Sequence, residues 1–172
     1  MPQADLHGLC GAWQSKQQDD FTMNIPAEDC LAIQELLQRY ALDVDTSQLD
    51  RLMALFIEDL MFDETRIGGA VAHGEAELSQ TYRSAFEQFH MAHHGSSGIV
   101  DEFGGDRARG CYTYQAVVRV KATGAPWQIE ACYQDEYRKQ DGRWLFQSRV
   151  VVPLIPPAPL EGISATWAHT AS

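Results

Sequence analysis

The stretch EACYQDEYRKQDGRWLFQSR, residues 130–149, predicts two strands joined by a tight turn. Apolar and polar side chains alternate on both sides of the QDG sequence at 140–142, which is typical of a half-buried β-hairpin. Outward from this hairpin, GGD and TGAP turns separate further alternating segments, so we expect strands at 99–103, 107–122, 126–138 and 144–154. Consecutive strands with short turns favour an antiparallel meander.

Before residue 98 the apolar residues follow a helical period instead. Three segments repeat apolar residues every three or four positions: 26–41, 46–56 and 74–94, the last ending at Gly95. Three helices followed by a meander predict an α+β fold in which the helices cover one sheet face. We expect a curved sheet, shaped like a half-open cone or barrel, with a pocket between helices and strands.

Composition restricts the classes of partner. The chain has 24 acidic and 13 basic residues, a net charge of −11, which repels nucleic acid and anionic lipid. No apolar run approaches the ~18 residues that cross a membrane, and the N-terminus lacks the pattern of a secretory signal. We therefore expect a cytoplasmic protein with no nucleic-acid or membrane partner.

Cysteine usage agrees with that location. The four cysteines, at positions 10, 30, 111 and 132, form no CxxC pair and no short-range metal spacing. In a reducing compartment we interpret them as small hydrophobic residues rather than reactive thiols.

The chain divides into three parts. Residues 1–24 are polar and are interpreted as an arm, whereas residues 25–155 carry the predicted helices and strands. The tail, 156–172, contains prolines and apolar residues but no regular element that could bury them. We expect the tail to pack on a neighbouring subunit in a homotrimer, with a homodimer as the alternative.

The stretch FHMAHHGSSG, residues 89–98, contains three of the six histidines. On the predicted third helix, position 93 comes four residues after Phe89 and seven after Phe86, so His93 lies on the buried stripe. His90 and His94 flank that stripe. A buried histidine beside a carboxylate can act as a general base, and His93 is the candidate.

Asp45 is the candidate partner of His93. It lies with Asp43 at the end of the first predicted helix, where the helix dipole disfavours negative charge. One explanation is that these aspartates cap the next helix or face solvent. The other is an Asp45–His93 dyad, in which the carboxylate orients the imidazole and stabilises the cation formed by proton abstraction.

The histidine cluster also permits a metal-binding interpretation, because histidines three or four positions apart can chelate a metal on a helix. No clear third ligand and no HEXXH motif accompany them. We therefore predict neither a metal nor a cofactor. Structural histidines with satisfied hydrogen bonds are the remaining alternative.

Arg149 is the third candidate, in the last predicted strand. In the alternation of GRWLFQSRVVV, Trp144 and Phe146 lie on one face and Arg149 on the other. A buried guanidinium requires a carboxylate or an anionic ligand. Arg149 therefore either pairs with Asp43 or Asp135, or faces the pocket and stabilises negative charge.

Taken together, AIQELLQRY, the VD step, LFIEDLMFD, a histidine before a short turn, and EACYQDEYRKQDGRWLFQSR resemble the SnoaL-like branch of the NTF2-like superfamily. The resemblance covers roughly residues 29–163. It is strongest to lindane dehydrochlorinase, scytalone dehydratase and bile-acid 7α-dehydratase, lyases that use an Asp–His pair. It implies a cone-shaped α+β fold, no cofactor and a tail that helps to build a trimer.

The resemblance also implies roles for single residues. Asp45 and His93 match the catalytic pair of the dehydrochlorinase, Tyr40 matches a pocket tyrosine of the bile-acid enzyme, and Arg149 matches the pocket arginine of the dehydrochlorinase. Strand alternation adds the residues expected to form the helix-facing pocket wall: Tyr114, Ala116, Ile129, Ala131, Tyr133 and Val151.

These observations favour a cofactor-independent lyase of the dehydratase type, acting on a hydrophobic, aromatic or polycyclic small molecule. An isomerase or a retro-aldol type lyase could use the same base. A non-catalytic binding or assembly subunit, like the dioxygenase β-subunits of the superfamily, is the alternative from a different class, because fold alone does not decide function.

Overall fold

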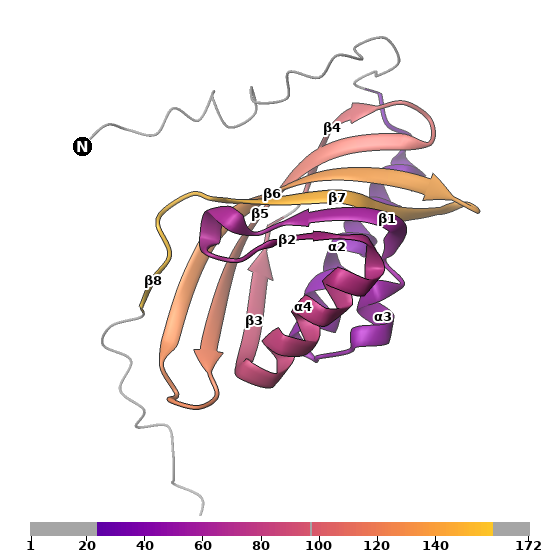
Figure 1. Cartoon of the computed structure of the whole chain (residues 1–172). Coiled ribbons are helices and arrows are strands. Elements are labelled where there is room, and N and C mark those ends of the chain that lie inside the picture. Colours follow the sequence, from indigo (N-terminus) through magenta and orange to yellow (C-terminus); the bar gives the residue numbers. More distant parts are fainter. Residues whose placement is uncertain (1–23, 97, 160–172) are drawn as a thin grey trace, which may run out of the picture.

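The computed structural model describes residues 24–96 and 98–159 (Figure 1). The predicted arm and most of the predicted tail lie outside the described residues. In chain order the elements are α2 (Ala27–Asp45), α3 (Leu49–Met53), β1 (Phe56–Asp63), η1 (Thr65–Ile67), β2 (Val71–His73), α4 (Gly74–Gln88), β3 (Phe89–Gly95), β4 (Ile99–Phe103), β5 (Arg107–Val120), β6 (Pro126–Gln140), β7 (Arg143–Pro153) and β8 (Ala158–Pro159).

Within the described residues the strands form one eight-stranded sheet in the order β2-β1-β7-β6-β5-β3, with β4 beside β5 and β8 beside β6. Neighbouring strands are antiparallel except β1 and β7, which are parallel. The helices lie on one side of the strongly curved sheet (Figure 1). Apolar side chains of both layers form the core between them, and this arrangement is the predicted cone-shaped α+β fold.

The predicted meander is present as β4, β5, β6 and β7, whose bounds agree with the expected ones to within a few residues. The β6–β7 turn contains Asp141 and Gly142, both with positive φ, 50° and 77°. A turn with two consecutive positive-φ residues has a twist that matches the right-handed twist of the flanking strands. Asp-Gly favours such a turn and is therefore a strong signal for a hairpin.

The third helix is shorter than predicted, because residues 89–95 form strand β3. This segment pairs with β5 from Phe89 opposite Val120 to Gly95 opposite Tyr114. The pairing satisfies backbone groups along the edge of β5, and this tertiary gain outweighs the weak local preference for helix. The inward position of His93 therefore follows from strand alternation and not from a helical stripe.

The predicted second helix is also shorter. α3 ends at Met53, and Phe56 begins β1, which pairs in parallel with β7 and antiparallel with β2. The sequence analysis missed β1 and β2, so the expectation of a four-stranded, fully antiparallel sheet is wrong. A parallel partner far along the chain leaves little local pattern to detect.

A β-bulge in β7 changes the predicted alternation. Glu136 pairs with Ser148 but Tyr137 pairs with Phe146, so Gln147 is an extra residue opposite β6. The extra residue reverses the alternation, and Phe146 and Arg149 consequently lie on the same buried face. The expectation that they lie on opposite faces is wrong.

Cys111 of β5 and Cys132 of β6 form a disulfide. Their interpretation as unpaired small hydrophobic residues is therefore wrong, whereas Cys30 is a free, partly buried thiol. Adjacent strands bring the two sulfurs together, since Cys132 pairs with Thr113, two residues after Cys111. No helix in the described part of the chain is long and apolar enough to cross a membrane.

Candidate active site

His93 of β3 and Asp45, the last residue of α2, form a hydrogen-bonded pair. His93 Nδ1 lies 2.6 Å from Asp45 Oδ1, and the His93 backbone N–H donates to Asp45 Oδ2 at 2.8 Å. One carboxylate thus holds both the ring and the backbone of the histidine. Because an ionised carboxylate can only accept, Nδ1 carries the proton and Nε2 is the basic nitrogen.

The pair lies at the border between core and solvent. The His93 side chain is 9% exposed and the Asp45 side chain 24%, so the carboxylate is partly open to solvent and the imidazole is nearly buried. His90 and His94 point to the opposite side of β3 and are exposed. They are not part of the pair.

The three neighbouring histidines do not converge on a common point, because alternate residues of a strand face opposite ways. Within residues 24–96 and 98–159 no group of three His, Cys, Asp or Glu side chains is placed to hold a metal ion.

Tyr40 of α2 lies beside the pair. Its ring meets the His93 ring edge to face, with centroids 6.4 Å apart. Its hydroxyl is 2.6 Å from the hydroxyl of Tyr82 on α4. Burial raises the pKa of both phenols, so both are neutral at neutral pH and can donate hydrogen bonds.

Tyr82 was not among the candidate site residues predicted from the sequence. It occupies the apolar stripe of its helix four positions after Leu78, and both side chains are buried. A tyrosine on such a stripe has the pattern of a core residue. Contact between its hydroxyl and that of Tyr40 joins two helices far apart in the sequence and is not visible in either segment alone.

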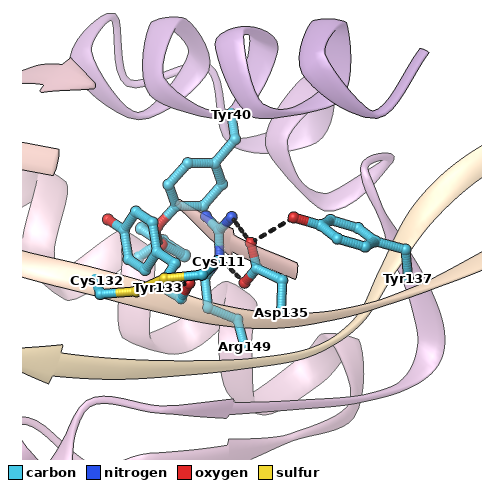
Figure 2. A network of polar contacts seen from close by, with 8 residues as sticks. Tyr40, Cys111, Cys132, Tyr133, Asp135, Tyr137 and Arg149 are labelled. Atoms are coloured by element: carbon cyan, nitrogen blue, oxygen red, sulfur yellow. Dashed lines mark hydrogen bonds and ion pairs between the residues drawn. A yellow bond between two sulfur atoms is a disulfide. The ribbon is translucent and has the colours of Figure 1, made fainter. Parts of the chain in front are cut away.

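Arg149 is fully buried and pairs with Asp135 of β6 rather than with Asp43 (Figure 2). Nε donates to Asp135 Oδ1 and Nη2 to Asp135 Oδ2, both at 2.7 Å, and the Tyr137 hydroxyl donates to Oδ2 at 2.9 Å. Asp43 instead lies 2.9 Å from a guanidinium nitrogen of Arg51. The parallel N–H donors of arginine match the two carboxylate oxygens of Asp135.

Aromatic rings surround the rest of the Arg149 guanidinium. Its central carbon lies 4.1 Å from the Tyr40 ring centroid, 3.8 Å from that of Tyr133 and 4.1 Å from that of Phe146. These contacts stabilise the buried cation. Nη1 is buried and has no hydrogen-bond partner among the described residues, so one nitrogen of the guanidinium makes no hydrogen bond within this part of the chain.

The predicted pocket wall lies on the helix-facing side of the sheet. Tyr114 and Tyr133 stack with ring centroids 4.0 Å apart and planes 8° from parallel, and the Tyr114 ring lies 5.6 Å from that of His93. The remaining four residues are buried or packed against the core: Ala116, Ile129, Ala131 and Val151. The wall thus combines stacked aromatic rings with small and aliphatic side chains, and Ala116 pairs directly with His93 across β3 and β5.

Glu64, just after β1, is a further ionisable residue of this region that the sequence analysis missed. Burial raises its pKa to about 7, Arg149 lowers it, and Asp63 raises it. Its charge in turn raises the pKa of Tyr40 and Tyr114. A glutamate at the end of a strand ordinarily faces solvent, so the sequence contains no signal for this position.

A separate groove of about 330 Å³ opens beside β3, β5 and β6. Most of its lining is polar and includes the exposed side chains of His94, Thr113 and Gln115. These three side chains point away from the face that carries His93, and Tyr114 of the predicted pocket wall also contributes to the lining of the groove.

The SnoaL-like domain family matches residues 26–150 of the chain. The chain belongs to the SnoaL-like family. No curated protein matches it significantly. The family contains lyases and proteins with other functions, so membership establishes the domain, and a lyase-type or related activity only coarsely.

Several solved structures have the same SnoaL-like fold. A Novosphingobium aromaticivorans protein, provisionally described as an aromatic ring hydroxylase, is 29% identical with a TM-score of 0.76, covering 80% of this chain and 96% of that chain. A provisional scytalone dehydratase from the same organism is 21% identical, TM-score 0.70, with coverages of 78% and 89%. Hexachlorocyclohexane dehydrochlorinase LinA-type3 from Novosphingobium barchaimii is 22% identical, TM-score 0.69, with coverages of 79% and 92%. The last two likenesses concern the fold alone.

Proposed function

We propose that this SnoaL-like protein is a cofactor-independent lyase of the dehydratase type, which removes a β-leaving group from a hydrophobic small molecule. The observation that supports the proposal best is the Asp45–His93 pair, in which one carboxylate holds the histidine ring at 2.6 Å and its backbone at 2.8 Å. A base held in this way is suited to abstract a proton from carbon. Similar structures named dehydratase and dehydrochlorinase support elimination as the reaction type.

In the proposed step, His93 Nε2 takes a proton from the carbon next to the one that carries the leaving group. The electrons of the broken C–H bond form the new double bond, and the leaving group departs with the electrons of its own bond. Asp45 remains ionised and stabilises the imidazolium through Nδ1–H.

Tyr40 and Arg149 are the proposed electrophilic residues. The neutral Tyr40 hydroxyl donates a hydrogen bond to a substrate oxygen, the leaving oxygen or a carbonyl, as negative charge develops there. Arg149 has Nη1 available for the same purpose, while Asp135 holds the rest of its guanidinium in place. Preorganised donors of this kind lower the barrier without a metal.

The proposed substrate is hydrophobic and aromatic or polycyclic. Tyr114 and Tyr133 present stacked rings beside His93, and aromatic faces pack well against planar ring systems. The small side chains of Ala116 and Ala131, with Ile129 and Val151, complete the proposed binding surface.

Activity can be tested with two probes, a β-hydroxytetralone and its β-chloro counterpart, whose elimination products tautomerise to a naphthol that absorbs strongly. We expect His93→Ala to abolish turnover and Asp45→Asn to slow it about 10²–10⁴-fold, because the imidazole is then wrongly oriented. His90→Ala is the matched control, an exposed histidine on the same strand, and should retain activity. EDTA should have no effect, and an α-deuterated probe should react more slowly.

Full activity of His93→Ala would refute the proposed base. The isomerase and retro-aldol alternatives share that base and are distinguished by their products. A non-catalytic subunit, by contrast, would bind a catalytic partner and would show no dependence on His93.

A homotrimer and a cytoplasmic location are part of the same proposal. The tail 156–172 is expected to pack on a neighbouring subunit because it carries apolar residues without a regular element. Light scattering should give the mass of three chains at micromolar concentration. A stable monomer would contradict the trimer. A dimer would also exclude the trimer, but each tail could still pack on the other chain.

A further inference from the structure

The Tyr82 side chain lies on the buried side of α4, the helix that precedes β3 in the chain. Its ring meets Phe62 of β1 edge to face, with centroids 6.0 Å apart, and is tilted against Phe86 at 5.6 Å. The residue is only 5% exposed. Because closely packed rings have little room to move, this packing also fixes the position of the Tyr82 hydroxyl.

The Tyr82 hydroxyl has one hydrogen-bond partner in the part of the chain that the structure describes. Its oxygen lies 2.6 Å from the hydroxyl oxygen of Tyr40 on α2, and the bond between them is buried. A buried O–H group needs an acceptor, and within residues 24–96 and 98–159 the Tyr40 oxygen is the acceptor within reach. Tyr82 therefore donates to Tyr40.

This direction determines where the Tyr40 proton can point. Each phenol carries one proton, and its oxygen can also accept a hydrogen bond. The proton of Tyr82 occupies the side of the Tyr40 oxygen that faces Tyr82. The proton of Tyr40 must therefore point away from the Tyr82 oxygen, where it is available to another acceptor.

Tyr40 connects Tyr82 to the proposed active site. Its ring meets that of His93 with centroids 6.4 Å apart and that of Tyr133, in the predicted pocket wall, at 5.6 Å. The Arg149 guanidinium lies 4.1 Å from the same ring. Burial raises the pKa of Tyr40, whereas Arg149 and the hydrogen bonds with Tyr82 and Tyr133 act in the opposite direction. These groups stabilise negative charge on the Tyr40 oxygen, which makes its O–H a better donor.

We propose that Tyr82 is a positioning residue, which directs the Tyr40 O–H toward the substrate oxygen and strengthens it as a hydrogen-bond donor. This inference rests on the proposed function, in which Tyr40 donates to that oxygen as negative charge develops. Tyr82 acts through Tyr40, the group that its hydroxyl contacts. No proton passes between the two phenols, so the proposed elimination step is unchanged.

The effect of Tyr82 belongs to the chemical step and not to substrate binding. The substrate oxygen carries more negative charge in the transition state than in the ground state, so a well-directed donor stabilises the transition state more. Loss of Tyr82 should therefore lower kcat and leave KM nearly unchanged. The net contribution of one neutral hydrogen bond corresponds to about 2–12-fold in rate.

The test is a double-variant cycle with the β-hydroxytetralone probe. Tyr82→Phe removes the hydroxyl and keeps the ring, so kcat should fall about 2–12-fold while KM changes less than about two-fold. Tyr40→Phe removes the donor itself and should lower kcat about 10²–10³-fold. In the Tyr40→Phe background, Tyr82→Phe should have no further effect, because the hydroxyl on which it acts is absent.

Trp144→Phe is the matched control. It also replaces a buried aromatic donor by phenylalanine and removes one buried hydrogen bond, the bond to Asp29. Trp144 is not among the residues proposed to act on the substrate, so this variant should keep the kcat of the unmodified protein. Urea denaturation of both variants checks that each is folded under the conditions of the assay.

An unchanged kcat for Tyr82→Phe, or a change confined to KM, would overturn the assignment. Equal slowing by Tyr82→Phe with and without the Tyr40 hydroxyl would also overturn it, as would equal slowing by Trp144→Phe. If His93→Ala remains fully active, the proposed function itself fails. If that variant is inactive while Tyr82→Phe or Tyr40→Phe reacts at the normal rate, the base remains and the role of Tyr82 fails.

Discussion

Replacing Asp135 by asparagine removes the negative half of an ion pair that is completely buried. Asp135 and Arg149 are both 0% exposed, and the carboxylate accepts two bonds from Arg149 at 2.7 Å and one from the Tyr137 hydroxyl at 2.9 Å. Asparagine has nearly the same shape, so the substitution changes charge and hydrogen bonding and leaves packing almost unaltered. Arg149 cannot move to water because aromatic rings enclose it.

The expected destabilisation follows from the charge left behind. Removing one partner of a buried ion pair typically costs about 3–5 kcal/mol. The aromatic rings around Arg149 still stabilise the cation by roughly 0.5–2 kcal/mol each, so we expect a loss near the lower end, about 3 kcal/mol. For a domain of this size, that loss lowers Tm by roughly 6–12 °C.

Urea denaturation and calorimetry measure this loss. Asp106→Asn is the control, because its ion pair with Arg138 at 3.4 Å is partly exposed and should contribute no more than about 1 kcal/mol. The double variant Asp135→Leu with Arg149→Met should recover stability, since an apolar pair replaces a buried ionic one. A loss below about 1 kcal/mol for Asp135→Asn would refute the conclusion that Asp135 and Arg149 are shielded from water and that each charge needs the other.

Three further predictions concern stability, and urea denaturation checks each. Gly110→Ala places a Cβ atom 2.3 Å from the Ile99 carbonyl oxygen, so it should separate β4 from β5 and cost about 1–3 kcal/mol. Trp144→Phe removes the 2.8 Å bond from Nε1 to the Asp29 carboxylate and should cost about 1.5–3 kcal/mol. Burial raises the pKa of Glu64 from 4.5 to about 7, so the folded state retains a proton that the unfolded state releases. The unfolding free energy should therefore fall as pH rises across that interval, and Glu64→Gln should flatten the decline.

His93 shows which structural features a local sequence pattern can predict. The sequence analysis placed it inward from a helical stripe, whereas the structure places it inward on a strand. Its separation of four residues from Phe89 is close to one helical turn and equal to two strand repeats, so both periods turn the two side chains the same way. The direction of the side chain was therefore predictable although the element was not.

Asp45 was predictable for a different reason. A negative charge in the last turn of a helix is disfavoured by the dipole, so its presence calls for a compensating partner, and the structure supplies one in His93. For Arg149 the sequence predicted that a buried guanidinium needs a carboxylate, but it did not predict which one. The choice of Asp135 over Asp43 depended on the register between β6 and β7.

Other features had no local signal. Nothing in the sequence around Gln147 marks it as a bulge. It is an extra residue in β7, a strand that pairs with β6 on one side and with β1 on the other. Tyr82 and Glu64 have the patterns of a core residue and a surface residue, respectively. The contact of Tyr82 with Tyr40 joins helices far apart in the chain, and the surroundings of Glu64 depend on the pairing of β1 with β7.

The sequence by itself determined the α+β class, the β4–β7 meander and its Asp-Gly turn, because alternation, helical period and positive-φ turns are properties of neighbouring residues. It also indicated Asp45, His93 and Arg149 as candidate site residues, and the family resemblance added Tyr40. Only the tertiary structure decided the β3 strand, the parallel β1–β7 pairing, the Cys111–Cys132 disulfide and the environment of Glu64. Each of these depends on backbone pairing or burial between distant segments, and such interactions exceed local preferences of a few tenths to about 1 kcal/mol per residue.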